Sequence, residues 1–165
     1  MALSQEGEPQ EAAAQMRPIL AAWRASGLLL GFPFYAVTLA EVCARAGQPE
    51  EARNLLTEAE EVIESNHQRG VESFAQAIKG ELLLQLPGQH EGEAEACFRL
   101  AIDLARSRSA KLGELQATTR LSRLWQKQGK NEEGRCLLAE VYGWFTEGFD
   151  TRDLKEAKAL LEEQS

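Results

Sequence analysis

One pattern of small and large residues recurs along the chain and constrains its fold more than any other feature of the sequence. In the clearest copy, Ala52 is followed four residues later by Leu56 and three residues after that by Ala59. The same spacing recurs in Ala12, Met16 and Ile19, in Ala94, Phe98 and Ala101, and in Gly134, Leu138 and Val141. Successive copies begin 40, 42 and 40 residues apart. This regularity predicts a structural repeat.

Each copy places its three residues on one face of a helix, because positions i, i+4 and i+7 lie on the same side. Another amphipathic stretch precedes each of the last three copies, at residues 34–46, 71–86 and 111–128. Every unit is therefore predicted to be a pair of helices. Glycines 47, 88 and 129 follow the first helices, where a left-handed residue commonly ends a helix, and Gly70 is expected to end the second helix of the first pair.

These units predict a single domain. Residues 1–9 are expected to be a flexible N-terminus, and residues 10–165 a repeat domain. Its parts are the second helix of a partial repeat at 10–26, repeats at about 33–69, 70–109 and 110–147, and a capping helix at 150–164. Asp150 and Asp153 resemble a cap for that last helix, whereas Pro18 is expected to kink or shorten the first one. Helix-forming residues dominate the composition and β-branched residues are scarce, which favours an all-α fold.

Charge and hydropathy exclude several classes of partner. The chain has 18 basic and 26 acidic residues, so its net charge of −8 opposes binding to nucleic acid. The longest strongly apolar stretch, residues 28–35, is far shorter than the roughly 20 residues needed to cross a bilayer. The start of the sequence lacks the basic and apolar regions of a secretory signal. We therefore expect no membrane association and a cytoplasmic location.

No pattern in the sequence indicates catalysis or metal binding. His67 and His90 lie near predicted helix ends and belong to no zinc motif. The cysteines, Cys43, Cys97 and Cys136, lie within helical patterns and are expected to be small buried hydrophobic residues. The phosphate-binding loop of nucleotide hydrolases and the serine nucleophile motif are both absent. We expect no enzymatic activity, no catalytic residues, no cofactor and no metal.

The paired helices resemble the tetratricopeptide family, whose usual repeat of about 34 residues is shorter than the repeat here. A narrower resemblance is carried by residues 142–151 (YGWFTEGFDT), 153–161 (DLKEAKALL), 80–84, 93–98 and 124–125. Over residues 11–162 the chain looks like the C-terminal region of bacterial multidomain signalling proteins. Those proteins join a predicted signalling ATPase, and often an adenylate/guanylate cyclase domain, to a helical repeat tail.

The resemblance implies a right-handed superhelix of antiparallel helix pairs, an α-solenoid, with a C-terminal capping helix. It also implies that the first helix of each pair lines a concave groove that binds a partner. The groove residues predicted in this way are Phe34, Val37, Glu41, Arg45, Phe74, Ala77, Glu81, Gln116, Thr119, Arg120, Arg123 and Lys127. Because charge changes sign along this row, we expect an extended partner with a basic part near the two glutamates and an acidic part near the cations of the third pair.

The function favoured by the sequence is a non-catalytic protein-protein interaction module with a regulatory or partner-recognition role in bacterial signalling. Its expected partner is a protein or peptide, which includes other domains of a parent signalling protein. The alternatives are structural self-association into a homo-oligomer and binding of a small molecule in the groove. Trp144, Phe145 and Phe149 are expected to seal the last repeat against the C-terminal helix, with a partner-binding patch as the other interpretation.

Overall fold

The computed structural model describes residues 9–27 and 29–164, and within these ranges every regular element is helical. This confirms the predicted all-α class. The expected flexible segment lies outside the described residues except for Pro9, which begins the first helix. The elements are α2 (Pro9–Ser26), α3 (Phe32–Arg45), α4 (Pro49–Asn66), the short 3-10 helix η1 (Arg69–Val71), α5 (Glu72–Gln85), α6 (Glu91–Ser107), α7 (Lys111–Lys127), α8 (Asn131–Tyr142) and α9 (Arg152–Glu163).

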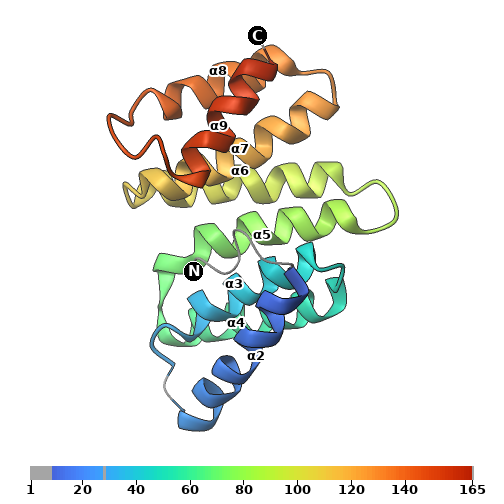
Figure 1. The fold of residues 1–165 in the computed structure, drawn as a ribbon, viewed down its shortest axis with the longest axis vertical. Coiled ribbons are helices and arrows are strands. Elements are labelled where there is room, and N and C mark those ends of the chain that lie inside the picture. The colour runs from blue at the N-terminus through green and yellow to red at the C-terminus, as the bar shows by residue number, and fades with distance from the viewer. Residues whose placement is uncertain (1–8, 28, 165) are drawn as a thin grey trace.

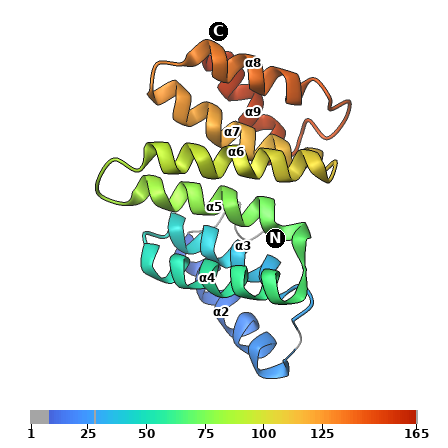
Figure 2. The ribbon, with the colours of Figure 1, turned by 180° about the vertical axis from the view of Figure 1, so that it is seen from behind.

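The helices are stacked in the order of the sequence. Each α-helix packs against the next one along the chain, and α3 also contacts α5, α5 contacts α7, and α7 contacts α9. Figure 1 shows the stack running from α2 at one end to α8 and α9 at the other, and Figure 2 shows the same order from behind. Because the first helices of the pairs touch one another, α3, α5 and α7 form one wall of the molecule.

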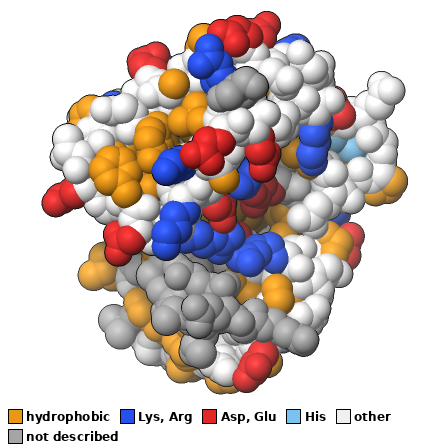
Figure 3. Space-filling model, turned by 45° about the horizontal axis from the view of Figure 1, so that its top comes forward, with side chains coloured by type: hydrophobic (Ala, Val, Ile, Leu, Met, Phe, Trp, Pro, Cys, Tyr) orange, Lys and Arg blue, Asp and Glu red, His pale blue; other side chains and the backbone are white. Residues whose placement is uncertain are grey.

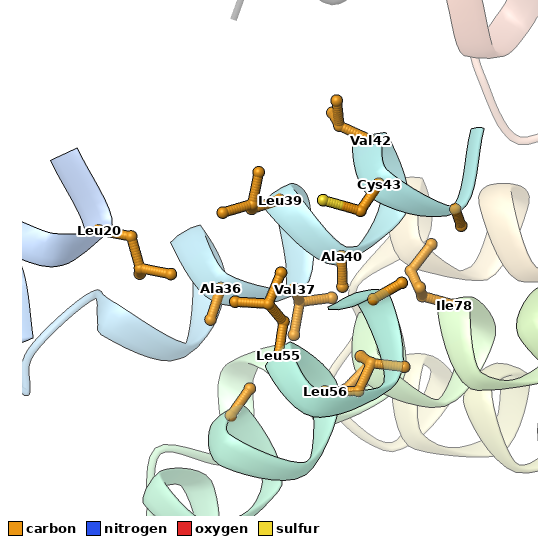
Figure 4. Packing of buried hydrophobic residues seen from close by; sticks show 14 of the residues in the cluster. Leu20, Ala36, Val37, Leu39, Ala40, Val42, Cys43, Leu55, Leu56 and Ile78 are labelled. Carbon is orange, nitrogen blue, oxygen red and sulfur yellow. The ribbon is translucent and has the colours of Figure 1, made fainter. Parts of the chain in front are cut away.

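The repeated small and large residues form the core. All members of the last three copies are buried. All of them except Gly134 belong to three successive clusters, which join α2 to α5, α5 to α7, and α7 to α9. Figure 4 shows part of the first cluster, where Val37 and Ala40 of α3 lie against Leu55 and Leu56 of α4. The repeat in the sequence is therefore the packing pattern between successive helices.

The earliest copy of the pattern is wrong at its third position. Ile19 is 47% exposed, whereas Leu20 is 1% exposed and packs in the first cluster. The buried face of α2 thus follows Ala13 and Leu20, which are seven residues apart and share one side of the helix. Pro18 does not shorten this helix, which continues from Pro9 to Ser26 with the proline on its exposed side.

Glycine follows the C-caps of α3 and α7, as predicted. Helix α5 instead ends at Gln85 with the extended Leu86 as its C-cap, so Gly88 lies in the turn three residues beyond the helix. Gly47, Gly88 and Gly129 all have positive φ values, of 74°, 120° and 76°. After α3 the amide of Gln48 donates to the carbonyl of Cys43 at 2.9 Å, which satisfies a carbonyl that the helix leaves without a partner. A residue with a side chain would be strained at these glycines.

Two predicted helix boundaries are wrong. Helix α4 ends at Asn66, with His67 in the left-handed conformation, and Gly70 lies inside η1 instead of ending α4. At the start of α9 the N-cap residue is Thr151, whose hydroxyl donates to the carbonyl of Gly148. Asp150 is therefore not the cap. Asp153 accepts a hydrogen bond from Gln116 of α7, so it joins two helices rather than capping one.

The prediction for the cysteines holds for only one of the three. Cys43 is buried, Cys97 is partly buried and Cys136 is exposed. Cys136 lies two residues before the buried Leu138, on the outer side of α8. Helical spacing alone does not distinguish the two sides when small residues occur on both.

No helix among the described residues has the length and apolar character that crossing a bilayer requires.

A buried carboxylate fastens α7 to α6. The Glu114 side chain is 3% exposed and accepts hydrogen bonds from Arg106 at 2.6 Å and from Lys111 at 2.8 Å. Burial alone would raise the pKa of Glu114, but the two cations outweigh it and hold the pKa below its usual value.

Glu114 is therefore expected to stabilise the fold at neutral pH and to lose that contribution as the pH falls through its lowered pKa. Urea unfolding at pH 7 and pH 3 measures this effect. The free energy of unfolding should decrease more between these values in the wild type than in Glu114→Gln, which does not titrate. Equal decreases in the two proteins would contradict the assignment. Glu133→Gln, an exposed change on α8, is the matched control.

Candidate partner-binding groove

A groove with a volume of about 700 Å³ crosses α3, α5 and α7 and is bordered by η1 and α9. All but two of the predicted groove residues line it. The exceptions, Val37 and Ala77, are 0% and 2% exposed and point into the core. Figure 4 shows Val37 lying over α4. These two are wrong as groove residues because they fall on the sides of α3 and α5 that face neighbouring helices.

Several groove residues were not predicted from the sequence. They are Thr38, Gly70, Val71, Leu84, Gln85, Leu112, Arg152, Asp153 and Glu156. Helical spacing could have found some of them, since Thr38 is four residues after Phe34 and Gln85 is four residues after Glu81. The residues from α9 could not be found in this way. The side of the stack on which α9 packs depends on contacts with α7 and α8.

The N-terminal ends of α3, α5 and α7 make one end of the groove apolar. The rings of Phe34 and Phe74 lie 6.0 Å apart between centroids and are tilted by 39°. Phe34 is 44% exposed and Leu112 is 49% exposed, and both line the groove together with Val71. Apolar side chains thus remain accessible at the place where three first helices begin.

A charged cluster occupies the middle of the groove. The Nη2 atom of Arg120 donates to Oε1 of Glu41 at 3.1 Å, and its Nε lies 2.9 Å from Oε1 of Glu81 without hydrogen-bond alignment. The Arg120 side chain is 13% exposed, Glu41 23% and Glu81 30%. One guanidinium therefore links α3, α5 and α7. Burial raises the pKa of Glu41 above its usual value, against the opposing effect of Arg120.

The α9 side of the groove is also internally paired. Glu156 lies 3.2 Å from Nη2 of Arg123 and 2.6 Å from Nε of Arg152. The Gln116 amide donates to Asp153 at 3.0 Å. The sequence suggested that the acidic and basic residues of this row would meet different parts of a partner. The structure instead pairs both glutamates of this row with Arg120, and Arg123 with Glu156 of α9.

Two groove cations differ from the others. Arg45 and Lys127 are exposed, and no carboxylate of the described residues lies within 4.0 Å of either side chain. Both occupy the last turns of their helices, α3 and α7. The groove lining as a whole has five cations and four carboxylates, a formal charge of +1 on a chain whose net charge is −8. Figure 3 looks toward this side and shows basic and acidic side chains gathered next to one another, with hydrophobic side chains beside them.

Of the aromatic residues after α8, one fits a sealing role against the C-terminal helix and two are exposed. Phe145 packs against the third core cluster, in agreement with a sealing role. Trp144 and Phe149 are 59% and 47% exposed, although Phe149 lies against Tyr142 with 5.9 Å between ring centroids. Lys111 places its Nζ 5.8 Å from the centre of the Trp144 ring. These residues therefore seal the last helix pair only in part.

The two histidines lie at helix ends, as expected: His67 follows α4 and His90 precedes α6. Across residues 9–27 and 29–164, no group of three or more His, Cys, Asp or Glu side chains is arranged to hold a metal ion.

The groove is the feature on which a function can best be argued from physical grounds. Comparison with known protein families finds no family model that matches the chain, and comparison with curated proteins finds no significant match.

Proposed function

We propose that the chain is a non-catalytic protein-interaction module built as a short tetratricopeptide-like α-solenoid, a right-handed superhelix of antiparallel helix pairs closed by α9. It binds a protein segment in the groove across α3, α5 and α7. The observation that carries the proposal is the groove itself, about 700 Å³ in volume and lined by successive first helices. Its apolar end is accessible, which is typical of surfaces that bind protein segments.

The resemblance to the repeat tails of bacterial signalling ATPases and cyclases gives this proposal its context. On that basis the module acts in the cytoplasm and recognises a regulatory partner or another domain of its own signalling system. It carries out no chemical step and needs no cofactor. This part of the proposal rests on the sequence resemblance and not on the fold, because a fold alone does not determine a function.

The groove is tested by removing its accessible apolar side chains. We expect Phe34→Ala/Leu112→Ala to abolish retention of proteins that the wild-type domain captures from a bacterial lysate, because these side chains form the exposed apolar end. Capture is measured by quantitative mass spectrometry. The control, Leu100→Ala, removes a leucine of similar exposure that lies outside the groove. Equal losses in both variants would count against the groove.

Self-association is the second candidate, and it has its own observation. Ile19, Leu29 and Leu30 are 47%, 42% and 80% exposed at the α2 end of the stack. The end of a helical stack presents apolar surface that a second copy can cover. If this surface joins two copies, sedimentation equilibrium should give a mass that rises with concentration, and Ile19→Glu/Leu30→Glu should hold the protein at monomer mass. A constant wild-type mass would eliminate this candidate.

A further inference from the structure

The charges that line the groove are not equally available to a partner. All four groove carboxylates already have partners within the chain: Glu41 and Glu81 share Arg120, Glu156 holds Arg123 and Arg152, and Asp153 accepts from Gln116. The distances are 2.6 to 3.2 Å. A basic partner would have to displace these contacts. Net gain from such an exchange is small, because each new ion pair costs an existing one.

Two cations of the groove, unlike its carboxylates, have no ion-pair partner among the described residues. Arg45 ends α3 and Lys127 ends α7, and among the described residues neither has a carboxylate within ion-pair distance. They lie at the opposite helix ends from Phe34 and Leu112, since α3, α5 and α7 place their corresponding turns side by side. The two ends of the groove, measured along the direction of the helices, therefore differ in character. The groove is apolar at one end and internally neutralised in the middle. At the other end it carries the two cations, together with Leu84 in the last turn of α5, which is 37% exposed.

From this arrangement we infer that the groove binds an extended acidic segment, with apolar side chains on Phe34, Phe74 and Leu112 and carboxylates at Arg45 and Lys127. The inference rests on the proposed function and specifies its partner class. Phe34 and Arg45 are separated by about 16 Å along α3, and Leu112 and Lys127 by about 22 Å along α7, at 1.5 Å per residue. An extended chain covers these distances in about five to seven residues. The partner segment is thus a short peptide with an apolar half and an acidic half.

A random heptapeptide display library, selected on the immobilised domain, tests this inference without prior choice of sequence. Recovered peptides are synthesised with a fluorescent label and titrated by anisotropy. We expect them to combine apolar residues with at least two acidic ones. We also expect the reversal Arg45→Glu/Lys127→Glu to weaken their binding at least tenfold, and the wild-type affinity to fall as salt is raised.

The matched control, Arg53→Glu/Lys155→Glu, changes the net charge equally at exposed positions outside the groove and should leave affinity within twofold. Thermal unfolding of each variant confirms that it is folded. Peptides that depend on Phe34 and Leu112 but are basic, or whose binding is unaffected by the groove reversal, would overturn the acidic partner and leave the groove as a peptide site. In that case Arg45 and Lys127 serve only the helix ends. Failure to recover any peptide that depends on Phe34 and Leu112 would overturn the groove as well.

Discussion

Replacing Gly80 with alanine is expected to destabilise the fold by about 2 kcal/mol, the opposite of what the same change does in an open helix. Gly80 lies inside α5, and a Cβ atom at this position would be 2.6 Å from Cε1 and 2.9 Å from Cδ1 of Phe98. Phe98 is 1% exposed, so its ring cannot move toward solvent. The contact therefore sets how closely α5 and α6 approach.

Urea unfolding of the variant measures this effect, and Gly92→Ala is the matched control. Gly92 lies in the first turn of α6, is exposed, and has open space around the position of a Cβ atom. Alanine there should be neutral or should stabilise by about 0.5 kcal/mol. Adding Phe98→Leu to Gly80→Ala should give less destabilisation than the sum of the single changes, because the smaller side chain relieves the clash. Additive effects would show that the close contact does not set the spacing of these helices.

Removing the guanidinium in the middle of the groove is the second change with a large expected effect. Arg120→Met should destabilise the protein by about 2 kcal/mol at pH 8, because Glu41 and Glu81 then lie partly buried with no cation between them. Arg53→Met is the matched control, since Arg53 contacts Glu50, whose side chain is 79% exposed. Exposed pairs of this kind contribute about 0.5 kcal/mol or less.

The destabilisation by Arg120→Met should decrease as the pH falls. In the wild type the pKa of Glu41 is already raised by burial, and Arg120 opposes that rise. Loss of Arg120 raises the folded-state pKa further. A raised carboxyl pKa favours the folded state below the unfolded pKa, and that contribution disappears as pH rises through the folded pKa. The difference in unfolding free energy between wild type and Arg120→Met should thus be smaller at pH 5 than at pH 8. Adding Glu41→Gln to Arg120→Met should recover part of the lost stability. A difference that does not change with pH would contradict the role given to this cluster.

Local features of the sequence were enough to predict the helices and the buried faces of α4, α6 and α8. The triad around Ala94 and Phe98 marks a buried helix face because helical geometry brings positions i, i+4 and i+7 together. Gly47 and Gly129 mark helix ends because only glycine adopts a left-handed conformation without strain. The groove residues were implied by the resemblance to tetratricopeptide repeats, and all but two of them line the groove.

The errors came from properties that no local pattern contains. Val37 has the spacing of a groove residue but is buried, because α4 covers that side of α3. Ile19 and Leu20 are both apolar, and only the direction from which α3 approaches α2 selects Leu20 for the core. Asp153 has the position of a helix cap, yet it meets Gln116 from a helix that lies 37 residues away in the sequence.

The sequence by itself determined that this protein is all-helical and which faces of α4, α6 and α8 are buried, because each of these follows from side-chain spacing along one helix. Only the tertiary structure decided how the groove charges are used. Arg120 lies 79 residues from Glu41, and their contact forms only when α3, α5 and α7 stack side by side. That stacking neutralises the middle of the groove and leaves Arg45 and Lys127 available, because pairing between distant charges depends on the arrangement of the helices in space.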